Sequence, residues 1–151
     1  STEINAVIGR SQLTRLDANN ARRTANLRLF LGSLDPTKYR TDFAMEGSCS
    51  YGFTLILRHP DATLWTRVER TLRALRVEFR RGTAGGGNQL RQPYLRRLMG
   101  ERMYADFPQA EHVHFYGCYI GNYPSLSQEK IAASANSSTP SSPAGAIRAR
   151  G

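Results

Sequence analysis

A strand–helix–strand pattern that leads into a glycine-rich stretch is the feature that most constrains how this 151-residue chain can fold. Residues 51–58 are almost entirely apolar, which is typical of a strand covered on both faces. His59, Pro60 and Asp61 predict a turn, and Asp61 or Thr63 can cap the helix that follows. Residues 77–79 then alternate like a half-buried strand. The helix between the strands is predicted to bury Leu64, Trp65, Val68, Leu72 and Leu75.

The glycine-rich stretch, residues 77–94, passes from strand-like alternation to glycines and then to polar and cationic side chains. Glycine permits unusual backbone angles and close approach, whereas arginine and amide side chains bind phosphates and sugar hydroxyls. We therefore expect a loop that binds an anionic ligand, next to the start of a helix that opens with Pro93. The spacing matches neither the dinucleotide fingerprint nor a Walker loop. A flexible connection with solvated arginines is the alternative interpretation.

Positive charge is concentrated around the same stretch. The formal net charge is +9, and residues 61–104 contain ten arginines but only four acids. A basic balance indicates nucleic acid, a membrane surface or an anionic small molecule as the partner. Basic and aromatic side chains alternate here, so a small basic nucleic-acid-binding protein is the alternative function. No recognition-helix, RNP-type or zinc-finger pattern supports that alternative.

The flanking segments predict an α+β fold. Apolar residues recur every three or four positions across residues 2–34, which predicts a long N-terminal helix, with a possible break at the polar residues 17–24. Pro93 to about Met103 is expected to be helical, with Leu95, Leu98 and Met99 facing inward. Residues 112–123 predict an aromatic strand, and Ser125 with Gln128 predicts a capping box. Together these features predict one domain over residues 1–133, with a small, mostly antiparallel sheet and flanking helices. Residues 134–151 predict a disordered Ser/Pro-rich tail.

Few residues indicate chemistry directly. His112 and His114 would face the same way on a strand, but no third ligand can be assigned, so a structural or substrate-contacting role is favoured over a metal site. Neither a nucleophile–base pair nor an acid–base dyad is recognisable, so we assign no catalytic residue. Cys49 and Cys118 are predicted to be reduced thiols. No apolar run approaches the ~18 residues of a membrane span, and a soluble, cytoplasmic protein is expected.

Three stretches resemble the DegT/StrS-type family, fold-type-I enzymes that depend on pyridoxal phosphate and act on nucleotide-linked keto sugars. They are residues 2–13 (TEINAVIGRSQL), 87–94 (GNQLRQPY) and 119–126 (YIGNYPSL). The middle stretch is the most specific, and its Gly-Asn-x-x-Arg-Gln-Pro motif is closer to that of the sugar 3-dehydratases than to that of the transaminases. Together the three stretches span nearly all of residues 1–133.

The resemblance implies the small C-terminal domain of a fold-type-I enzyme. It implies pyridoxal phosphate as the cofactor of the parent family, a nucleotide-linked 4-keto-6-deoxy sugar as the substrate, and a homodimer or a partner chain that supplies the large domain. Such products enter polysaccharides or antibiotic sugars. The implied substrate-binding residues are Arg80, Arg81, Asn88, Gln89, Arg91, Gln92, His114 and Tyr116.

The chain also departs from the family pattern. In the family, a preceding large domain supplies the cofactor phosphate site, the acid that pairs with the pyridine nitrogen, and a Schiff-base lysine or a histidine. Lys38 and Lys130 do not occupy matching positions. We therefore expect a truncated C-terminal portion that binds no cofactor and catalyses no reaction by itself.

Overall fold

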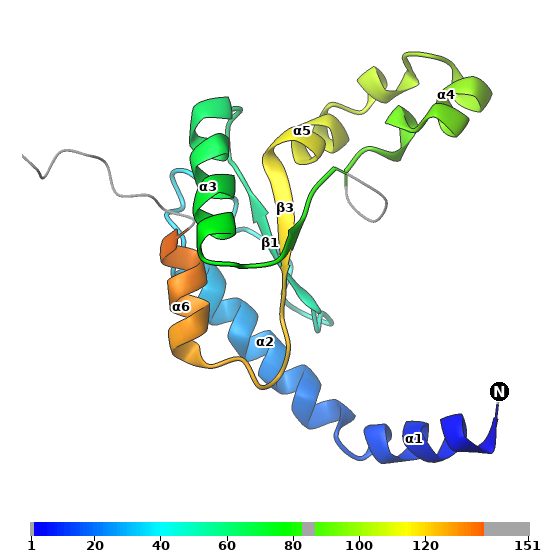
Figure 1. Ribbon diagram of the computed structural model, residues 1–151, viewed down its shortest axis with the longest axis vertical. Helices are drawn as coiled ribbons and strands as arrows, with labels where there is room; N and C mark the ends of the chain where they lie inside the picture. Colours follow the sequence, from blue (N-terminus) through cyan, green and yellow to red (C-terminus); the bar gives the residue numbers. More distant parts are fainter. Residues whose placement is uncertain (1, 83–86, 138–151) are drawn as a thin grey trace, which may run out of the picture.

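The computed structural model describes residues 2–82 and 87–137 (Figure 1). Residues 83–86 of the predicted ligand loop and residues 138–151 of the predicted tail lie outside this part. The described elements are α1 (Glu3–Leu13), α2 (Leu16–Gly32), β1 (Gly52–Ile56), α3 (Ala62–Ala74), β2 (Phe79–Arg80), the 3-10 helix η1 (Gln89–Arg91), α4 (Pro93–Met99), the 3-10 helix η2 (Met103–Asp106), α5 (Pro108–Tyr116), β3 (Gly117–Gly121) and α6 (Gln128–Ser137).

The three strands form an antiparallel sheet with the order β1-β3-β2. Ile120 of β3 lies opposite Phe53 of β1 on one side and opposite Phe79 of β2 on the other. The predicted strand–helix–strand unit therefore exists, but the last strand in the sequence is inserted between its two strands. The predicted α+β class and the antiparallel sheet are confirmed.

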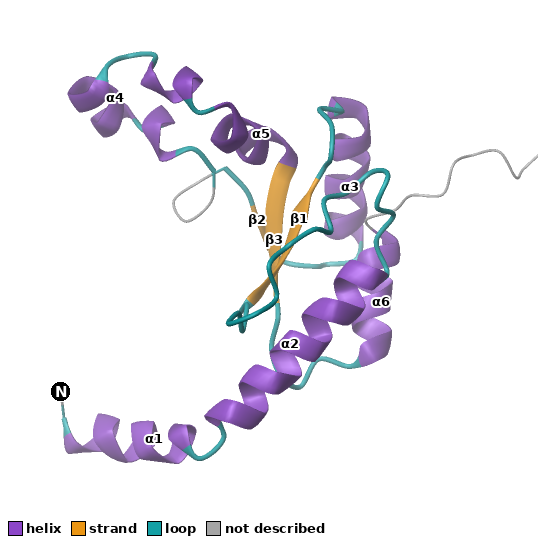
Figure 2. Cartoon of the chain, turned by 180° about the vertical axis from the view of Figure 1, so that it is seen from behind, coloured by secondary structure: helices purple, strands orange, loops and turns teal. Residues whose placement is uncertain are grey.

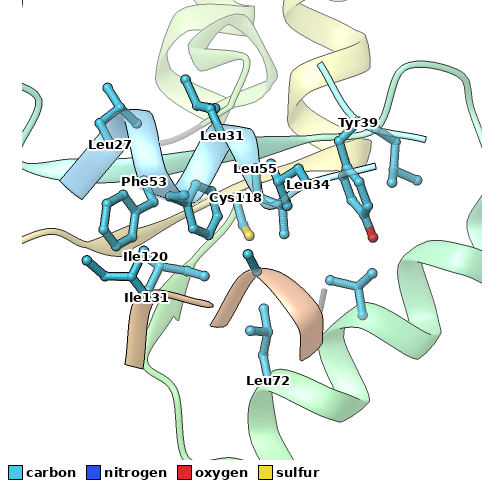
Figure 3. Close-up of a cluster of buried hydrophobic side chains, with 14 of the residues drawn as sticks. Leu27, Leu31, Leu34, Tyr39, Phe53, Leu55, Leu72, Cys118, Ile120 and Ile131 are labelled. Atoms are coloured by element: carbon cyan, nitrogen blue, oxygen red, sulfur yellow. The ribbon is translucent and has the colours of Figure 1, made fainter. Parts of the chain in front are cut away.

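Helices α2, α3 and α6 cover one face of the sheet (Figures 1 and 2). Phe53 and Leu55 of β1 and Ile120 of β3 are buried against them, and the rings of Phe30 and Phe53 stack with centroids 4.5 Å apart (Figure 3). Strand side chains alternate between faces, so the neighbouring residues of β1 and β3 lie on the opposite, helix-free face. The predicted cap of α3 is confirmed, because the Asp61 carboxylate accepts a hydrogen bond from the Leu64 N–H at 2.8 Å.

The predicted long N-terminal helix is two helices. The break lies at Thr14 and Arg15, just before the predicted polar section, and α2 continues through that section to Gly32. Helix α2 buries Leu27, Phe30 and Leu31, but α1 has no buried residue. Helix α1 extends away from the sheet in both views (Figures 1 and 2).

The strand predicted over residues 112–123 is wrong for its first half. Residues 108–116 form helix α5, which begins with Pro108 at its first turn, and only residues 117–121 form a strand. Proline is favoured at the start of a helix, so Pro108 opens α5 rather than ending the preceding segment. Gly117 allows the helix to join the strand, because a Cβ there would lie 2.7 Å from the Val113 carbonyl oxygen. His112 and His114 consequently point about 160° apart on a helix, not in one direction.

The inward face predicted for Leu95, Leu98 and Met99 is wrong for the last two, whereas Leu95 is half-buried. Helix α4 ends at Met99, before Gly100 with φ +108°, and Leu98 and Met99 are 78% and 51% exposed. Leu75 follows the last turn of α3 and is 54% exposed, although it was predicted to be buried.

At the C-terminal side, α6 runs through Ser137, past the predicted start of the tail at Ser134, and buries Ala135. The residue that caps its first turn is Ser127, whose hydroxyl accepts from the Lys130 N–H at 3.4 Å, rather than Ser125. Both cysteines are free, Cys49 exposed and Cys118 buried. No helix in the described part is long and apolar enough to cross a membrane.

Two leucines near the end of α3 test this placement of the core. Leu72 is fully buried, so Leu72→Ala should lower the free energy of unfolding by about 2–5 kcal/mol in urea denaturation. Leu75→Ala removes the same atoms from a mostly exposed position and should change the free energy of unfolding by less than about 0.5 kcal/mol. Equal losses for the two variants would contradict the observed end of α3.

Candidate functional site

The helix-free face of the sheet carries a cavity of about 230 Å³. Thr54 of β1, Tyr119 of β3 and Arg80 of β2 meet there, because Thr54 pairs with Tyr119 and Tyr119 pairs with Arg80 across the sheet. The residues that line the cavity are Ser50, Tyr51, Gly52, Thr54, Ile56, Arg80, Arg81, Gly82, Gly87, Val113, Gly117, Cys118 and Tyr119.

Two arginines supply positive charge to this cavity, and they differ in how firmly their guanidinium groups are held by other residues. The Arg81 guanidinium donates to Glu69 Oε1 and to the Phe115 carbonyl oxygen, each at 2.7 Å, and lies over the Trp65 ring. Among the residues that the structure describes, the ion pair of Arg80 is a long contact with Glu78, 3.6 Å between Nη2 and Oε1, and both side chains are mostly exposed. Arg80 can therefore turn toward a ligand, whereas Arg81 is held in place.

Aromatic and hydroxyl groups complete the cavity. The rings of Tyr51 and Tyr119 meet edge to face with centroids 5.9 Å apart, and Tyr51 is 70% exposed. Thr54 adds a hydroxyl beside them. Arginine, tyrosine and threonine side chains around one hollow suit a ligand that combines an anionic group with hydroxyls or a planar ring.

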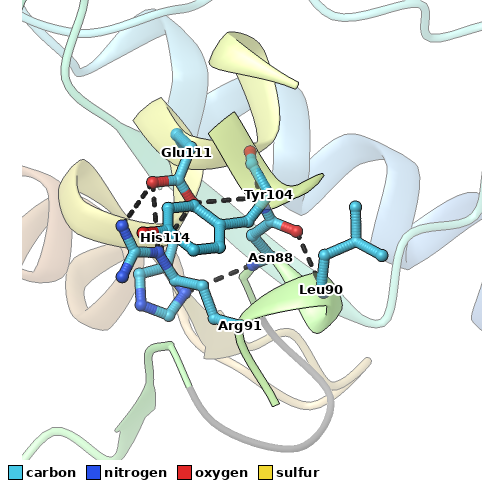
Figure 4. Close-up of polar contacts among 6 residues, drawn as sticks. All are labelled: Asn88, Leu90, Arg91, Tyr104, Glu111 and His114. Atoms are coloured by element: carbon cyan, nitrogen blue, oxygen red, sulfur yellow. Dashed lines mark hydrogen bonds and ion pairs between the residues drawn. The ribbon is translucent and has the colours of Figure 1, made fainter. Parts of the chain in front are cut away.

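Beyond the cavity, Arg91 and Glu111 join η1 to α5. Arg91 Nε donates to Glu111 Oε1 at 2.8 Å, and Arg91 Nη2 donates to Glu111 Oε2 at 2.5 Å (Figure 4). The guanidinium lies between the rings of Tyr104 and Phe115, 4.3 and 4.7 Å from their centroids. The hydrogen bonds from Arg91 lower the pKa of Glu111, and a further bond from Asn88 acts in the same direction. We call Asn88, Arg91, Tyr104, Glu111 and Phe115 the Arg91 clamp.

Asn88 is buried within this clamp. Its side-chain amide donates to Glu111 Oε1 at 2.9 Å and to the Tyr104 carbonyl oxygen at 3.1 Å, and its Oδ1 accepts from the Leu90 N–H. Its backbone N–H donates to Nδ1 of His114 at 3.2 Å. The polar groups of Asn88 and the guanidinium of Arg91 are therefore engaged within the protein, and their expected contact with substrate stays a prediction.

The remaining expected residues lie apart. Gln92 precedes α4, where its carbonyl oxygen accepts from the Leu95 and Arg96 N–H groups, and the exposed Gln89 makes one long contact with Tyr94. Tyr116 packs against the hydrophobic core. Of the eight expected substrate-binding residues, Arg80 and Arg81 line the cavity. His112 bonds to the Leu57 carbonyl oxygen, far from the partner of His114, and the described residues contain no group of ligands that could hold a metal ion.

Several residues of this region were missed in the sequence. Alternation along residues 52–56 could have placed Thr54 on the face opposite Phe53, since their side chains must point apart. The contact between Tyr51 and Tyr119 depends on the pairing of the strands. The contact between Glu111 and Arg91 depends on how the chain folds back over η1. No spacing in the sequence indicates either contact.

The Arg91 clamp predicts a pH-dependent contribution to stability. Glu111→Gln should lower the free energy of unfolding by about 1–3 kcal/mol at pH 7, because a charged hydrogen-bond pair is lost in a partly buried place. The pKa of Glu111 is lowered in the folded protein, so the carboxylate stabilises the fold above its ordinary value of 4.5. The difference in the free energy of unfolding between wild type and Glu111→Gln should shrink as the pH falls below 4.5.

Denaturation in urea at several pH values measures this effect. Glu101→Gln is the matched control, because Glu101 pairs with Arg96 but is 67% exposed, and its change should stay under about 0.5 kcal/mol. A Glu111→Gln loss that is the same at pH 7 and pH 3 would show that the ion pair is not its origin.

The model of the DegT/DnrJ/EryC1/StrS aminotransferase family matches residues 2–137. No curated protein sequence matches the chain. Among solved structures, the chain is similar to GDP-4-keto-6-deoxymannose-3-dehydratase, a structure with a trapped PLP-glutamate geminal diamine, at 20% identity and a TM-score of 0.73. The match covers 86% of this chain and 33% of the dehydratase, so this chain spans about a third of that enzyme's length and shares the fold of that part. The neighbour contains pyridoxal phosphate, the cofactor that the sequence resemblance implies. The chain belongs to the DegT/DnrJ/EryC1/StrS aminotransferase family.

Proposed function

We propose that this chain forms the C-terminal part of a pyridoxal-phosphate-dependent enzyme that acts on a nucleotide-linked 4-keto-6-deoxy sugar. The family match over residues 2–137 is the observation that carries this proposal. The product would enter a cytoplasmic pathway to a polysaccharide or a deoxysugar. The Gly-Asn-x-x-Arg-Gln-Pro wording of residues 87–93 favours a 3-dehydratase over an aminotransferase, in line with the fold of the dehydratase neighbour.

The cavity on the helix-free face is the proposed substrate site of this chain. A sugar nucleotide carries a diphosphate, hydroxyls and a planar base, and Arg80 offers a charged donor that no short ion pair engages within residues 2–82 and 87–137. Thr54 and the two tyrosines offer hydroxyls and ring edges beside it. Gln89 and Gln92 would reach the substrate from the far side of the loop. Asn88, Arg91, His114 and Tyr116 would act by holding that loop and its strand in place.

The residues present do not form a pyridoxal phosphate site by themselves. The cofactor, when bound, serves as an electron sink, and the sequence resemblance implies a lysine or a histidine beside it. Among the described residues, no histidine lines the cavity. Lys38 forms an ion pair with Asp35 at 3.0 Å, and Lys130 lies on α6 beside Phe53 and Ile120, on the other side of the sheet from the cavity. Neither lysine lines the cavity. We therefore derive no reaction step through the cofactor in this chain.

We propose that a larger, cofactor-binding domain covers the cavity and the exposed apolar face of α1. Helix α1 has eleven residues and no buried side chain, and Ile4, Val7 and Ile8 on one of its faces are 55–70% exposed. A helix of this length is marginal in water unless its apolar face is packed. About two thirds of the neighbour's length lies outside the part that this chain covers. The domain would belong to the same polypeptide or to a partner chain, with a homodimer as the expected assembly.

Borohydride trapping tests the cofactor part of this proposal. The 151-residue chain, mixed with pyridoxal phosphate and reduced, should give no stoichiometric adduct on one lysine by mass spectrometry. Trace labelling shared by Lys38 and Lys130 is the expected background. A single, fully modified lysine would overturn the proposal that this chain forms no cofactor site by itself.

A matched pair of arginine variants tests the substrate site. Binding of GDP-mannose, followed by titration in NMR spectra, should weaken about tenfold in Arg80→Ala, since a charged hydrogen bond of about 1.5 kcal/mol is lost. Arg97→Ala removes the same charge from the exposed side of α4 and should leave the affinity within about twofold. Equal weakening in both variants would indicate nonspecific attraction to a basic protein.

The same titration separates the nucleic-acid alternative. Arg67 and Arg70 are exposed on α3 and Arg76 is exposed just after it, and within residues 2–82 and 87–137 they have no ion pair within 4.0 Å. If the chain binds nucleic acid, a single-stranded RNA should shift α3 signals in a salt-dependent way, and GDP-mannose should not displace it.

A further inference from the structure

The imidazole ring of His114 lies against both described ends of the glycine-rich stretch. The Asn88 N–H donates to its Nδ1 at 3.2 Å (Figure 4). A Cβ at Gly87 would lie 2.5 Å from the same nitrogen, and a Cβ at Gly82 would lie 3.5 Å from the ring's Cε1. Both glycines have positive φ, +59° at Gly82 and +91° at Gly87. The backbone therefore approaches the ring at positions where only glycine fits without strain.

This contact specifies the protonation state of His114. An imidazole nitrogen that accepts a hydrogen bond carries no proton, so the proton of neutral His114 lies on Nε2. An imidazolium carries a proton on both nitrogens and cannot accept. Protonation would thus place an N–H of His114 against the N–H of Asn88. Asn88 is 5% exposed, so the unpaired amide would cost free energy that water does not restore.

The surroundings of His114 favour the neutral ring. Burial lowers the pKa of His114 from its ordinary value of 6.5, and the cations Arg91 and Arg81 lower it further. Glu111 acts in the opposite direction but is engaged by Arg91. Because the pKa is lower in the folded than in the unfolded protein, the contribution to stability is present above 6.5 and is lost as the pH falls through the lowered value.

We propose that His114 is a positioning residue whose neutral imidazole holds the Gly87–Asn88 backbone against α5, and whose protonation releases that backbone. Gly82 and Gly87 both line the cavity on the helix-free face of the sheet, so release of the Gly87–Asn88 backbone would change the shape of the cavity's rim. The effect on ligand binding rests on the proposed function, whereas the effect on the Asn88 backbone does not. The first experiment is therefore performed without ligand.

NMR titration of the full chain from pH 8 to pH 5 tests the proposal. In wild type, the Asn88 amide signal should move with the same midpoint as the His114 ring, below 6.5. In His114→Asn, the amide oxygen can replace Nδ1 as an acceptor that does not titrate, so the Asn88 signal should stay near its pH 8 position throughout. His59→Asn removes a histidine from an exposed turn and should leave the Asn88 titration unchanged. An Asn88 titration that persists in His114→Asn, or its absence in wild type while His114 titrates, would overturn the proposal.

Two glycine variants provide an independent test of the same contact. Gly87→Ala should push the ring away from Asn88, so the Asn88 signal should no longer follow His114. Gly100 also has a positive φ, +108°, but nothing lies within 4 Å of a Cβ there. Gly100→Ala therefore has comparable backbone strain without the contact and should keep the coupled titration. Coupling that survives in Gly87→Ala, or is lost in both variants, would refute the assigned role of His114.

A third experiment tests whether His114 affects ligand binding in the cavity. GDP-mannose affinity should fall between pH 7.5 and pH 5.5 in wild type and stay constant within about twofold in His114→Asn. If the ligand-free titrations behave as expected but GDP-mannose does not bind at any pH, the proposed substrate is wrong and the positioning role stands. A parallel fall in affinity in both proteins would overturn the link between His114 and the cavity.

Discussion

The burial of one face of a three-stranded sheet under α2, α3 and α6 is the constraint on which the rest of the structure depends (Figure 3). Side chains of a strand alternate between faces, so the register that buries Phe53 and Ile120 also places Thr54 and Tyr119 on the other side. That side has no covering helix in the described part, and there the strands form the floor of the cavity. The position of the candidate site is thus a consequence of how the core is packed.

A second constraint fixes the segment between β2 and β3. Residues 87–116 leave the sheet, fold through η1, α4 and η2, and return as α5 (Figure 2). The Arg91 clamp joins the outgoing and returning parts through a two-point ion pair between aromatic rings, and the buried Asn88 donates to Glu111 and to the Tyr104 carbonyl oxygen. Polar residues that suggest ligand binding in the sequence are here used to shape the chain. The side chains left free for a ligand lie on the strands and at the edges of the loop.

This division of labour agrees with membership of the aminotransferase family and with a chain that spans about a third of its solved neighbour. In the proposed enzyme, this chain orients the substrate while the cofactor and the proton-transferring groups come from a larger domain. The uncovered faces fit that arrangement. Helix α1 exposes its apolar residues, and α1 and α4 extend to the same side of the sheet as seen in both views (Figures 1 and 2).

The sequence by itself determined the family, the α+β class, the first strand, α3 with Asp61 or Thr63 as its cap, and the concentration of positive charge near the glycine-rich stretch. These properties depend on local patterns: apolar periodicity, capping residues and motif spacing. The tertiary structure decided the rest. It made residues 112–116 helical although they belong to the predicted aromatic strand, inserted β3 between β1 and β2, and brought Glu111 to Arg91 across 20 positions. It also turned His114 away from His112 and toward the ends of the glycine-rich stretch. Such contacts depend on which distant surfaces bury each other, and no window of neighbouring residues contains that information.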